Sequence, residues 1–253
     1  IENIMETEII SVNTHTDKEE VAKLLSKYDL LAIPVLDAEN YMVGIVTVDD
    51  AMDVMEDEAT EDITKMAAMN PSEKPYFETS VWGHAKNRIL WLLVLMLSAT
   101  ITGSILTHYE DAFQAIPLLV SFIPMLMDTG GNCGTQSSTL IIRGLALDEI
   151  HFRDIFRVMF KEFRISLIVG IILAAANGLR ILIMYHSLNM AVVIALSLMA
   201  TIIISKMIGC VLPLFAKKIR LDPAIMAAPL ITTLVDTCSV MVYFAIATQV
   251  FQL

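Results

Sequence analysis

The chain has 253 residues, of which 56% are hydrophobic, and its positive mean hydropathy indicates a membrane protein. The charge is unevenly distributed. Residues 1–80 carry 19 acidic and 5 basic side chains, whereas residues 81–253 carry 9 and 12. An acidic module is therefore joined to a mildly basic membrane module, a balance that argues against nucleic acid as a partner and favours cations.

The first 50 residues alternate helix and strand signals. Residues 17–27 predict an amphipathic helix, and residues 30–36 and 41–48 predict two strands joined by a polar turn. This order resembles a CBS domain, a small α/β unit that normally works in pairs, and one copy is present. Because the chain begins at Ile1 in what reads as the middle of a domain, we expect further residues to precede it.

The second strand leads into a helix through Thr47, Asp49 and Asp50. In many CBS domains the threonine and aspartate of this motif contact a nucleotide ribose. Thr47 and Asp50 are therefore a candidate nucleotide site, with ATP as the candidate ligand. Capping of the following helix by Asp49 or Asp50 is the alternative.

An acidic run occupies residues 49–62 and contains no base. Its members are Asp49, Asp50, Asp53, Glu56, Asp57, Glu58, Glu61 and Asp62. Several pairs lie four residues apart, and each like-charge pair costs a helix roughly 0.2–0.5 kcal/mol. A solvated acidic surface is one interpretation. Because the run precedes the first membrane segment, we favour a sensor in which bound Mg²⁺ or Ca²⁺ relieves the repulsion.

Five apolar segments reach the length needed to cross a membrane. They are residues 88–107, 112–142, 163–185, 190–216 and 223–252. The expected fold class is an α-helical membrane protein with five transmembrane helices per subunit, preceded by a partial cytosolic CBS (α/β) module and an acidic connecting helix. The expected domains are the CBS module at 1–50, the connecting helix and linker at 51–80, and the membrane domain at 81–253.

The basic residues between the segments predict the orientation. They are Lys86 and Arg88; Arg143, Arg153, Arg157, Lys161 and Arg164; and Lys217, Lys218 and Arg220. The intervening loops and the C-terminal tail contain no Lys or Arg, so we expect a cytoplasmic N-terminus and an external C-terminus. Two bases break the pattern. Arg180 is close enough to an end to snorkel, whereas Lys206 lies deeper and needs an acid, a carbonyl or water.

The second segment has an unusually polar interior between Asp128 and Thr139. It includes Gly130, Gly131 and Gly134 among asparagine, glutamine and hydroxyl side chains. Glycines permit a backbone break or a close helix approach, and an irregular backbone at membrane depth is tolerated only against protein or a watery cavity. A small-residue packing interface is the alternative.

Asp236 is an acid near the middle of the fifth segment, which makes it a functional candidate by default. Asn132 lies eleven residues before Arg143, or about 16 Å along a helix. Asp236 lies fourteen residues after Asp222, or about 21 Å. Both polar groups therefore fall near mid-membrane, which predicts one water-filled path lined by the second and fifth segments.

Several motifs together resemble the MgtE family of magnesium channels over essentially the whole chain. The matching stretches are 58–63, 130–138 followed by 143–146, 221–224, and 229–236. The resemblance implies a homodimer in the cell (plasma) membrane, with its pore on the dimer axis. It also implies a helical N-terminal domain, two CBS domains, a connecting "plug" helix and five transmembrane helices per subunit. This sequence corresponds to the second CBS domain onward.

The resemblance also implies functional residues. Asp236 is similar to the pore aspartate that holds hydrated Mg²⁺ through water, and Asp222 resembles the acid at the cytoplasmic pore mouth. Carbonyls of a broken second segment around Gly130, Gly131 and Asn132 would add to the pore site. The implied sensor acids are Glu19, Asp29, Asp50, Asp53, Glu58, Glu61 and Asp62. High internal Mg²⁺ would close the pore and low Mg²⁺ would open it.

Two positions depart from the family, and two other functions compete. Ala228 stands where some members carry asparagine, and Asp128 is an acid that the family does not require.

An intramembrane aspartyl protease would use Asp128 and Asp236, but the Gly-x-Gly-Asp pattern of those enzymes is absent, so we expect no enzyme. A membrane-anchored magnesium or nucleotide sensor without a pore is the other alternative, and it leaves the polar second segment unexplained.

Overall fold

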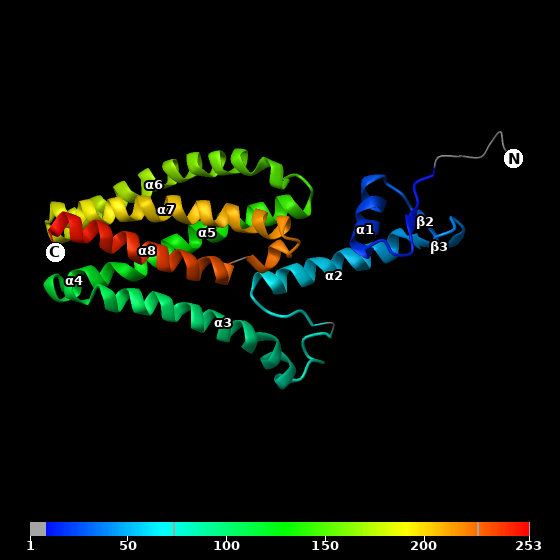
Figure 1. Ribbon diagram of the computed structural model, residues 1–253, viewed down its shortest axis with the longest axis horizontal. Coiled ribbons are helices and arrows are strands. Elements are labelled where there is room, and N and C mark those ends of the chain that lie inside the picture. The colour runs from blue at the N-terminus through cyan, green and yellow to red at the C-terminus, as the bar shows by residue number, and fades with distance from the viewer. Residues whose placement is uncertain (1–8, 73, 227, 253) are drawn as a thin grey trace. The chain divides into compact units, whose positions relative to one another are not determined.

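The computed structural model describes residues 9–72, 74–226 and 228–252, with the side chains of 111–113 left aside. The chain folds as two compact units, residues 1–63 and 64–253. Figure 1 traces the order of the elements along the chain.

The first unit is a small α/β module. Its elements are β1 (Val12–Asn13), α1 (Lys18–Lys27), β2 (Ala32–Leu36), β3 (Met42–Thr47) and the beginning of α2 (Val48–Met66). The sheet order is β1-β2-β3, with β1 parallel and β3 antiparallel to β2. The helix and strands expected between residues 17 and 48 are confirmed.

A compact apolar core holds this unit together. Leu25 of α1 and Ile33 of β2 are fully buried, and Ala51 of α2 joins the same cluster. The helix begins where the Asp17 side chain accepts a hydrogen bond from the Glu19 N–H at 2.9 Å, which satisfies a backbone donor that has no partner within the helix.

The second unit is almost entirely helical. Its elements are α3 (Val81–His108), α4 (Glu110–Ala115), η1 (Pro117–Phe122), α5 (Ile123–Ala146), η2 (Phe152–Asp154), α6 (Ile155–Tyr185), α7 (Leu188–Lys218), η3 (Pro223–Met226) and α8 (Ala228–Phe251). In the part of the chain that the structure describes, four segments are long and apolar enough to cross a membrane. They are Val81–His108, Phe152–Tyr185, Leu188–Lys218 and Pro223–Phe251.

The second of the five expected spans is not a single apolar helix in the structure. The segment expected at 112–142 is divided into α4, η1 and α5, and the polar interior of α5 keeps it out of the apolar set. Pro117 begins η1 and Pro124 stands in the first turn of α5, where a missing N–H costs no helical hydrogen bond. Within the described residues, four of the five expected spans are therefore long and apolar enough to cross a membrane, and the second is not confirmed.

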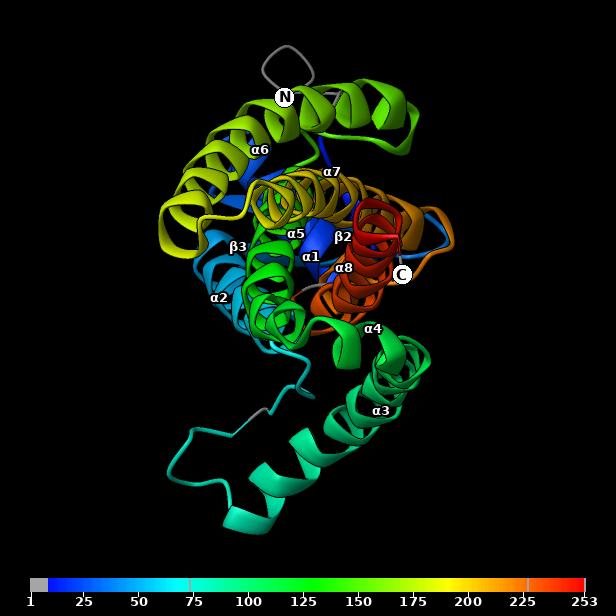
Figure 2. The same cartoon turned by 90° about the vertical axis from the view of Figure 1, so that its left-hand side faces the viewer.

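Helix α7 occupies the centre of the second unit. It packs against α5, α6 and α8, while α3 packs chiefly against α8, as the end-on view in Figure 2 shows. Ile194, Leu198 and Ile202 of α7 are fully buried in the principal core, beside Tyr243 and Phe244 of α8.

Helix α5 runs without interruption through its glycines, so the broken second segment that the family resemblance implied is wrong. The glycines instead permit close helix approach. A Cβ atom built at Gly134 would lie 2.7 Å from the Ile231 side chain, and one at Gly209 would overlap the Gly134 carbonyl group. Because the carbonyls at 130–134 belong to a continuous helix, they are not the freed ligands that a break would supply.

Candidate functional site

An open pocket of about 140 Å³ lies between α5 and α8. Its lining residues are Met127, Asp128, Gly131, Asn132, Thr232 and Asp236. Asn132 and Asp236 therefore meet in one pocket, as their expected depths predicted. Asp128 and Asn132 are exposed, and Asp236 is half-buried.

The glycines of α5 bring this pocket together. A Cβ atom built at Gly131 would lie 2.9 Å from the Thr232 methyl group, and one at Gly130 would lie 2.8 Å from Val235. Val235 is fully buried, which turns the next residue, Asp236, toward the pocket on the neighbouring face of α8. Gly130 and Gly131 therefore act by allowing α5 and α8 to approach.

The described lining residues of the pocket present oxygen atoms, and none of them is basic. Two carboxylates, one amide and one hydroxyl belong to its lining. Hard divalent cations such as Mg²⁺ and Ca²⁺ prefer such oxygen ligands, and Mg²⁺ usually keeps several of its waters. Within the described residues no group of three or more histidine, cysteine or acidic side chains is placed to hold a metal ion. One chain thus offers two carboxylates here, not a complete protein cage.

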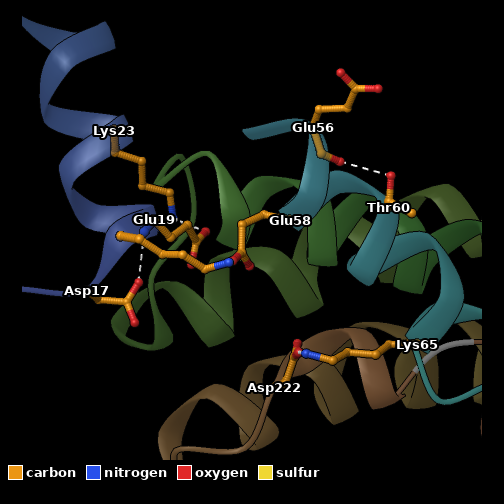
Figure 3. Close-up of polar contacts among 9 residues, drawn as sticks. Asp17, Glu19, Lys23, Glu56, Glu58, Thr60, Lys65 and Asp222 are labelled. Atoms are coloured by element: carbon orange, nitrogen blue, oxygen red, sulfur yellow. Dashed lines mark hydrogen bonds and ion pairs between the residues drawn. The ribbon is translucent and has the colours of Figure 1, made fainter. Parts of the chain in front are cut away.

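Asp222 lies in the turn between α7 and η3. Its Oδ1 accepts a hydrogen bond from the Ala224 N–H at 2.9 Å, and its Oδ2 lies 2.6 Å from Nζ of Lys65. Figure 3 shows this ion pair, in which both side chains are partly buried. Asp222 was predicted from the sequence, but its partner Lys65 was not, because 157 positions separate the two residues along the chain.

Two of the expected sensor acids are paired with lysines of α1. Glu58 of α2 lies 3.1 Å from Lys18, and Glu19 lies 2.6 Å from Lys23. Figure 3 shows Glu19, Lys23 and Glu58 in this arrangement. The hydrogen bond and charge of Glu58 raise the pKa of Lys18 above its ordinary value of 10.5, so Lys18 remains a cation at neutral pH.

The remaining sensor acids differ in their exposure to solvent. Asp29 is exposed just after α1, in the left-handed region with φ 52°. Asp50 and Asp53 are exposed on α2, whereas Glu61 and Asp62 are half-buried.

A second pocket, of about 200 Å³, lies within the first unit. Asp50 lines it beside Lys18, Asn13 and apolar side chains, but Thr47 is not among its lining residues. The Thr47 hydroxyl donates a hydrogen bond to Asp50 at 2.9 Å. The two residues of the expected nucleotide site, Thr47 and Asp50, are therefore hydrogen-bonded to each other. Asp50 also lines a pocket that contains the Lys18 side chain.

A buried ionic contact joins three helices of the second unit. Nζ of Lys206 on α7 lies 3.7 Å from Glu162 on α6, and Ser137 on α5 bridges the pair. This supplies the partner that Lys206 was expected to need. Glu162 was missed because it stands among the bases at 153–164, where an acid reads as part of a cytosolic loop.

Four described helices that are long and apolar enough to cross a membrane, with an acidic pocket between α5 and α8, indicate a multi-pass membrane protein. The MgtE family model, described as a divalent cation transporter, matches residues 123–246, and the CBS domain model matches residues 1–57. The chain belongs to the MgtE family, whose members are transporters and not enzymes.

Similar proteins are named as magnesium transporters. The Magnesium transporter MgtE of Bacillus subtilis is 41% identical over 248 residues, which is 98% of this chain and 54% of that protein. The protein of the same name from Thermus thermophilus is 38% identical over 247 residues, covering 98% of this chain and 55% of that protein. That of Enterococcus faecalis is 33% identical over 253 residues, covering 98% and 54%. The chain thus spans about half the length of these relatives.

Proposed function

We propose that the chain forms the pore of a Mg²⁺ channel, and that hydrated Mg²⁺ binds in the pocket between α5 and α8. The observation that carries this proposal is the convergence of Asp128, Asn132 and Asp236 from two helices on one pocket without a basic lining residue. The pocket is large enough to hold several water molecules beside an ion. Mg²⁺ gives up its waters reluctantly, so a site that reads the hydrated ion suits it.

A homodimer would complete this site. Each chain contributes two carboxylates on an open side of the bundle, and a second copy facing it across an axis would double that number. Asp128 and Asn132 are exposed in the single chain, as residues facing a shared path must be. The polar face of α5 would then meet water and protein instead of lipid.

The proposed topology has five spans. Helix α5 has 24 residues, or about 36 Å of length, enough to cross the hydrocarbon core of a bilayer. The proposed location is the plasma membrane, with a cytoplasmic N-terminus and an external C-terminus, because the basic loops then lie inside. The proposed functional division is a CBS module at 1–50, a connecting segment at 51–80 and the pore domain at 81–253.

Gating would come from the acidic helix α2. We infer that internal Mg²⁺ binds its carboxylates, relieves their repulsion and stabilises a closed pore, whereas low Mg²⁺ releases it. The sensor set remains Glu19, Asp29, Asp50, Asp53, Glu58, Glu61 and Asp62. ATP is the proposed ligand of the pocket lined by Asp50 and Lys18, since that pocket offers a cation for a phosphate and apolar walls for a base.

Mg²⁺ uptake into liposomes containing the full chain tests the proposal. Asp236→Asn removes the half-buried carboxylate with little change in shape and should abolish uptake, while Glu149→Gln removes an exposed charge outside the pocket and should leave uptake intact. Full uptake by Asp236→Asn would refute the pore assignment. A sensor anchored in the membrane would instead take up no Mg²⁺ in either form.

A further inference from the structure

Glu162, Ser137 and Lys206 form a polar triad inside the helical bundle. The Ser137 hydroxyl donates a hydrogen bond to Oε2 of Glu162 at 2.6 Å, and Nζ of Lys206 donates one to the Ser137 oxygen at 3.2 Å. The Lys206 and Glu162 side chains are only 6% and 8% exposed. Each of the three helices α5, α6 and α7 contributes one member.

Stability alone is a weak reason for this arrangement. Taking two charges out of water is expensive, and well-packed apolar residues of similar volume often replace a buried ion pair without loss. An ionisable group inside a membrane bundle is a functional candidate for the same reason. Hydrogen bonds require a particular distance and angle between donor and acceptor, whereas the hydrophobic effect is non-directional. The triad can therefore fix the relative orientation of its helices in a way that apolar contacts alone do not.

Helices α5 and α7 approach each other closely beside the triad. Gly134 of α5 meets Gly209 of α7 nearly backbone to backbone, and Gly130 meets the Thr201 methyl group. Small residues at these contacts allow the two backbones to come close together. Ser137 follows Gly134 by one turn, so its bonds to α6 and α7 lie beside this close approach and add contacts of fixed geometry to it.

We propose that this triad fixes the rotation and axial position of α5 against α6 and α7, and so aims Asp128 and Asn132 into the ion pocket. Glu162, Ser137 and Lys206 are positioning residues, because none of them lines the pocket. Ser137 stands five residues after Asn132 on one continuous helix, so a rotation at one is passed to the other. This inference rests on the proposed function of the pocket, since it concerns the alignment of its ligands.

The first test measures Mg²⁺ uptake over a range of Mg²⁺ concentrations, with Ca²⁺ as the competing ion. Ser137→Ala should raise the Mg²⁺ concentration for half-maximal uptake on the order of tenfold and weaken discrimination against Ca²⁺, because small displacements of ligands are costly. Ser137→Thr keeps the hydroxyl and should restore both values. Ser166→Ala is the matched control: it removes a buried hydroxyl that bonds within its own helix, to the Phe163 carbonyl.

A combined variant guards against misfolding. Replacing Glu162 by Leu, Lys206 by Met and Ser137 by Ala removes both charges and the bridge together, so no buried charge is left unpaired. If this variant melts like the wild type but has the shifted concentration dependence, the triad positions α5. If it has wild-type uptake and selectivity, the triad is only a buried ion pair and the inference is wrong.

A second measurement separates this inference from the proposed function. Asn132→Cys, in a background lacking Cys133, Cys210 and Cys238, reports on the exposure of the α5 face through its rate of reaction with a charged thiol reagent. Adding Ser137→Ala should change that rate about tenfold, even if the chain takes up no Mg²⁺. An unchanged rate would overturn the positioning role, whereas absence of uptake by the wild type would overturn only the pore.

Discussion

The ammonium group of Lys65 lies 2.6 Å from Oδ2 of Asp222, so the last turn of α2 is joined to the turn that precedes η3 and α8. The other carboxylate oxygen of Asp222 accepts the Ala224 N–H at 2.9 Å. Both oxygens therefore have a partner in this conformation. A divalent cation that binds Asp222 at the proposed pore mouth must compete with the Lys65 ammonium.

Lys65→Gln should accelerate Mg²⁺ uptake. The substitution removes the competing charge while keeping a polar side chain, and a partly exposed ion pair contributes about 1 kcal/mol, or roughly fivefold. Initial uptake rates in liposomes at low internal Mg²⁺ check the result. Lys74→Gln, which alters an exposed lysine in the linker, should have the wild-type rate. A slower Lys65→Gln variant would show that the ion pair holds the pore mouth open.

Gly209→Ala should destabilise the helical bundle. Its Cβ would overlap the Gly134 carbonyl, and backbone there cannot yield without separating α5 from α7. Overpacking of this kind costs typically 1–3 kcal/mol or more. The melting temperature of the detergent-solubilised chain should fall. Gly103→Ala is the control, since nothing lies within 4 Å of its Cβ and alanine favours a helix. An unchanged melting temperature for Gly209→Ala would show that the helices can separate without cost.

Local sequence patterns predicted the elements whose signals are local. The helix at 17–27, its two neighbouring strands and the acidic helix α2 all follow from periodicity and capping. The meeting of Asn132 and Asp236 followed from their expected depths in the membrane. These features were predictable because each depends on residues close together in sequence or on the fixed rise of a helix.

The features that escaped prediction depend on contacts distant in sequence. Glycine permits both a broken and a continuous helix, and close packing against α7 and α8 selected the continuous one in α5. The basic neighbours of Glu162 in sequence indicate a cytosolic loop, and only the fold shows that Glu162 is buried beside Lys206. No local pattern joins Lys65 to Asp222.

Asp128→Asn should weaken Mg²⁺ binding without abolishing transport. Asp128 shares the pocket with Asp236, so neutralising it lowers the negative charge available to the ion while leaving the half-buried acid in place. Loss of the attraction between an exposed carboxylate and the bound ion costs about 1 kcal/mol of binding free energy. The Mg²⁺ concentration for half-maximal uptake should therefore rise roughly fivefold. Concentration curves for Asp128→Asn and Asp236→Asn, measured side by side, check the order. Equal loss in both variants would mean that the two acids work as one unit.

Lys18→Met should make inhibition by internal Mg²⁺ occur at lower concentration. Lys18 pairs with Glu58 at 3.1 Å, so it competes with a divalent cation for one of the sensor acids. Because Glu58 raises the pKa of Lys18 above 10.5, the pair is intact at neutral pH, and its contribution to the stability of the first unit is lost as pH rises through the raised value. Inhibition curves at neutral pH test the competition, with Lys74→Met as the control. A higher inhibitory concentration in Lys18→Met would indicate that Lys18 supports the sensor instead.

Neutralising the acids in the second half of α2 should separate gating from permeation. Glu58→Gln, Glu61→Gln and Asp62→Asn, made together, remove three carboxylates from the proposed sensor but none from the pocket between α5 and α8. Carboxylates are the ligands that Mg²⁺ requires, so closure should need at least about tenfold more internal Mg²⁺.

Uptake into liposomes loaded with increasing Mg²⁺ measures this shift, while the rate at low internal Mg²⁺ should stay at the wild-type value. A matched variant neutralises three exposed acids elsewhere, Glu39, Glu78 and Glu149, and controls for the change in net charge. Both triple variants change the net charge of the chain by the same amount. A difference between their inhibition curves therefore reports on Mg²⁺ binding at α2 and not on the overall electrostatic field. Identical inhibition curves in both would remove the sensor from α2 and leave the pore assignment untouched.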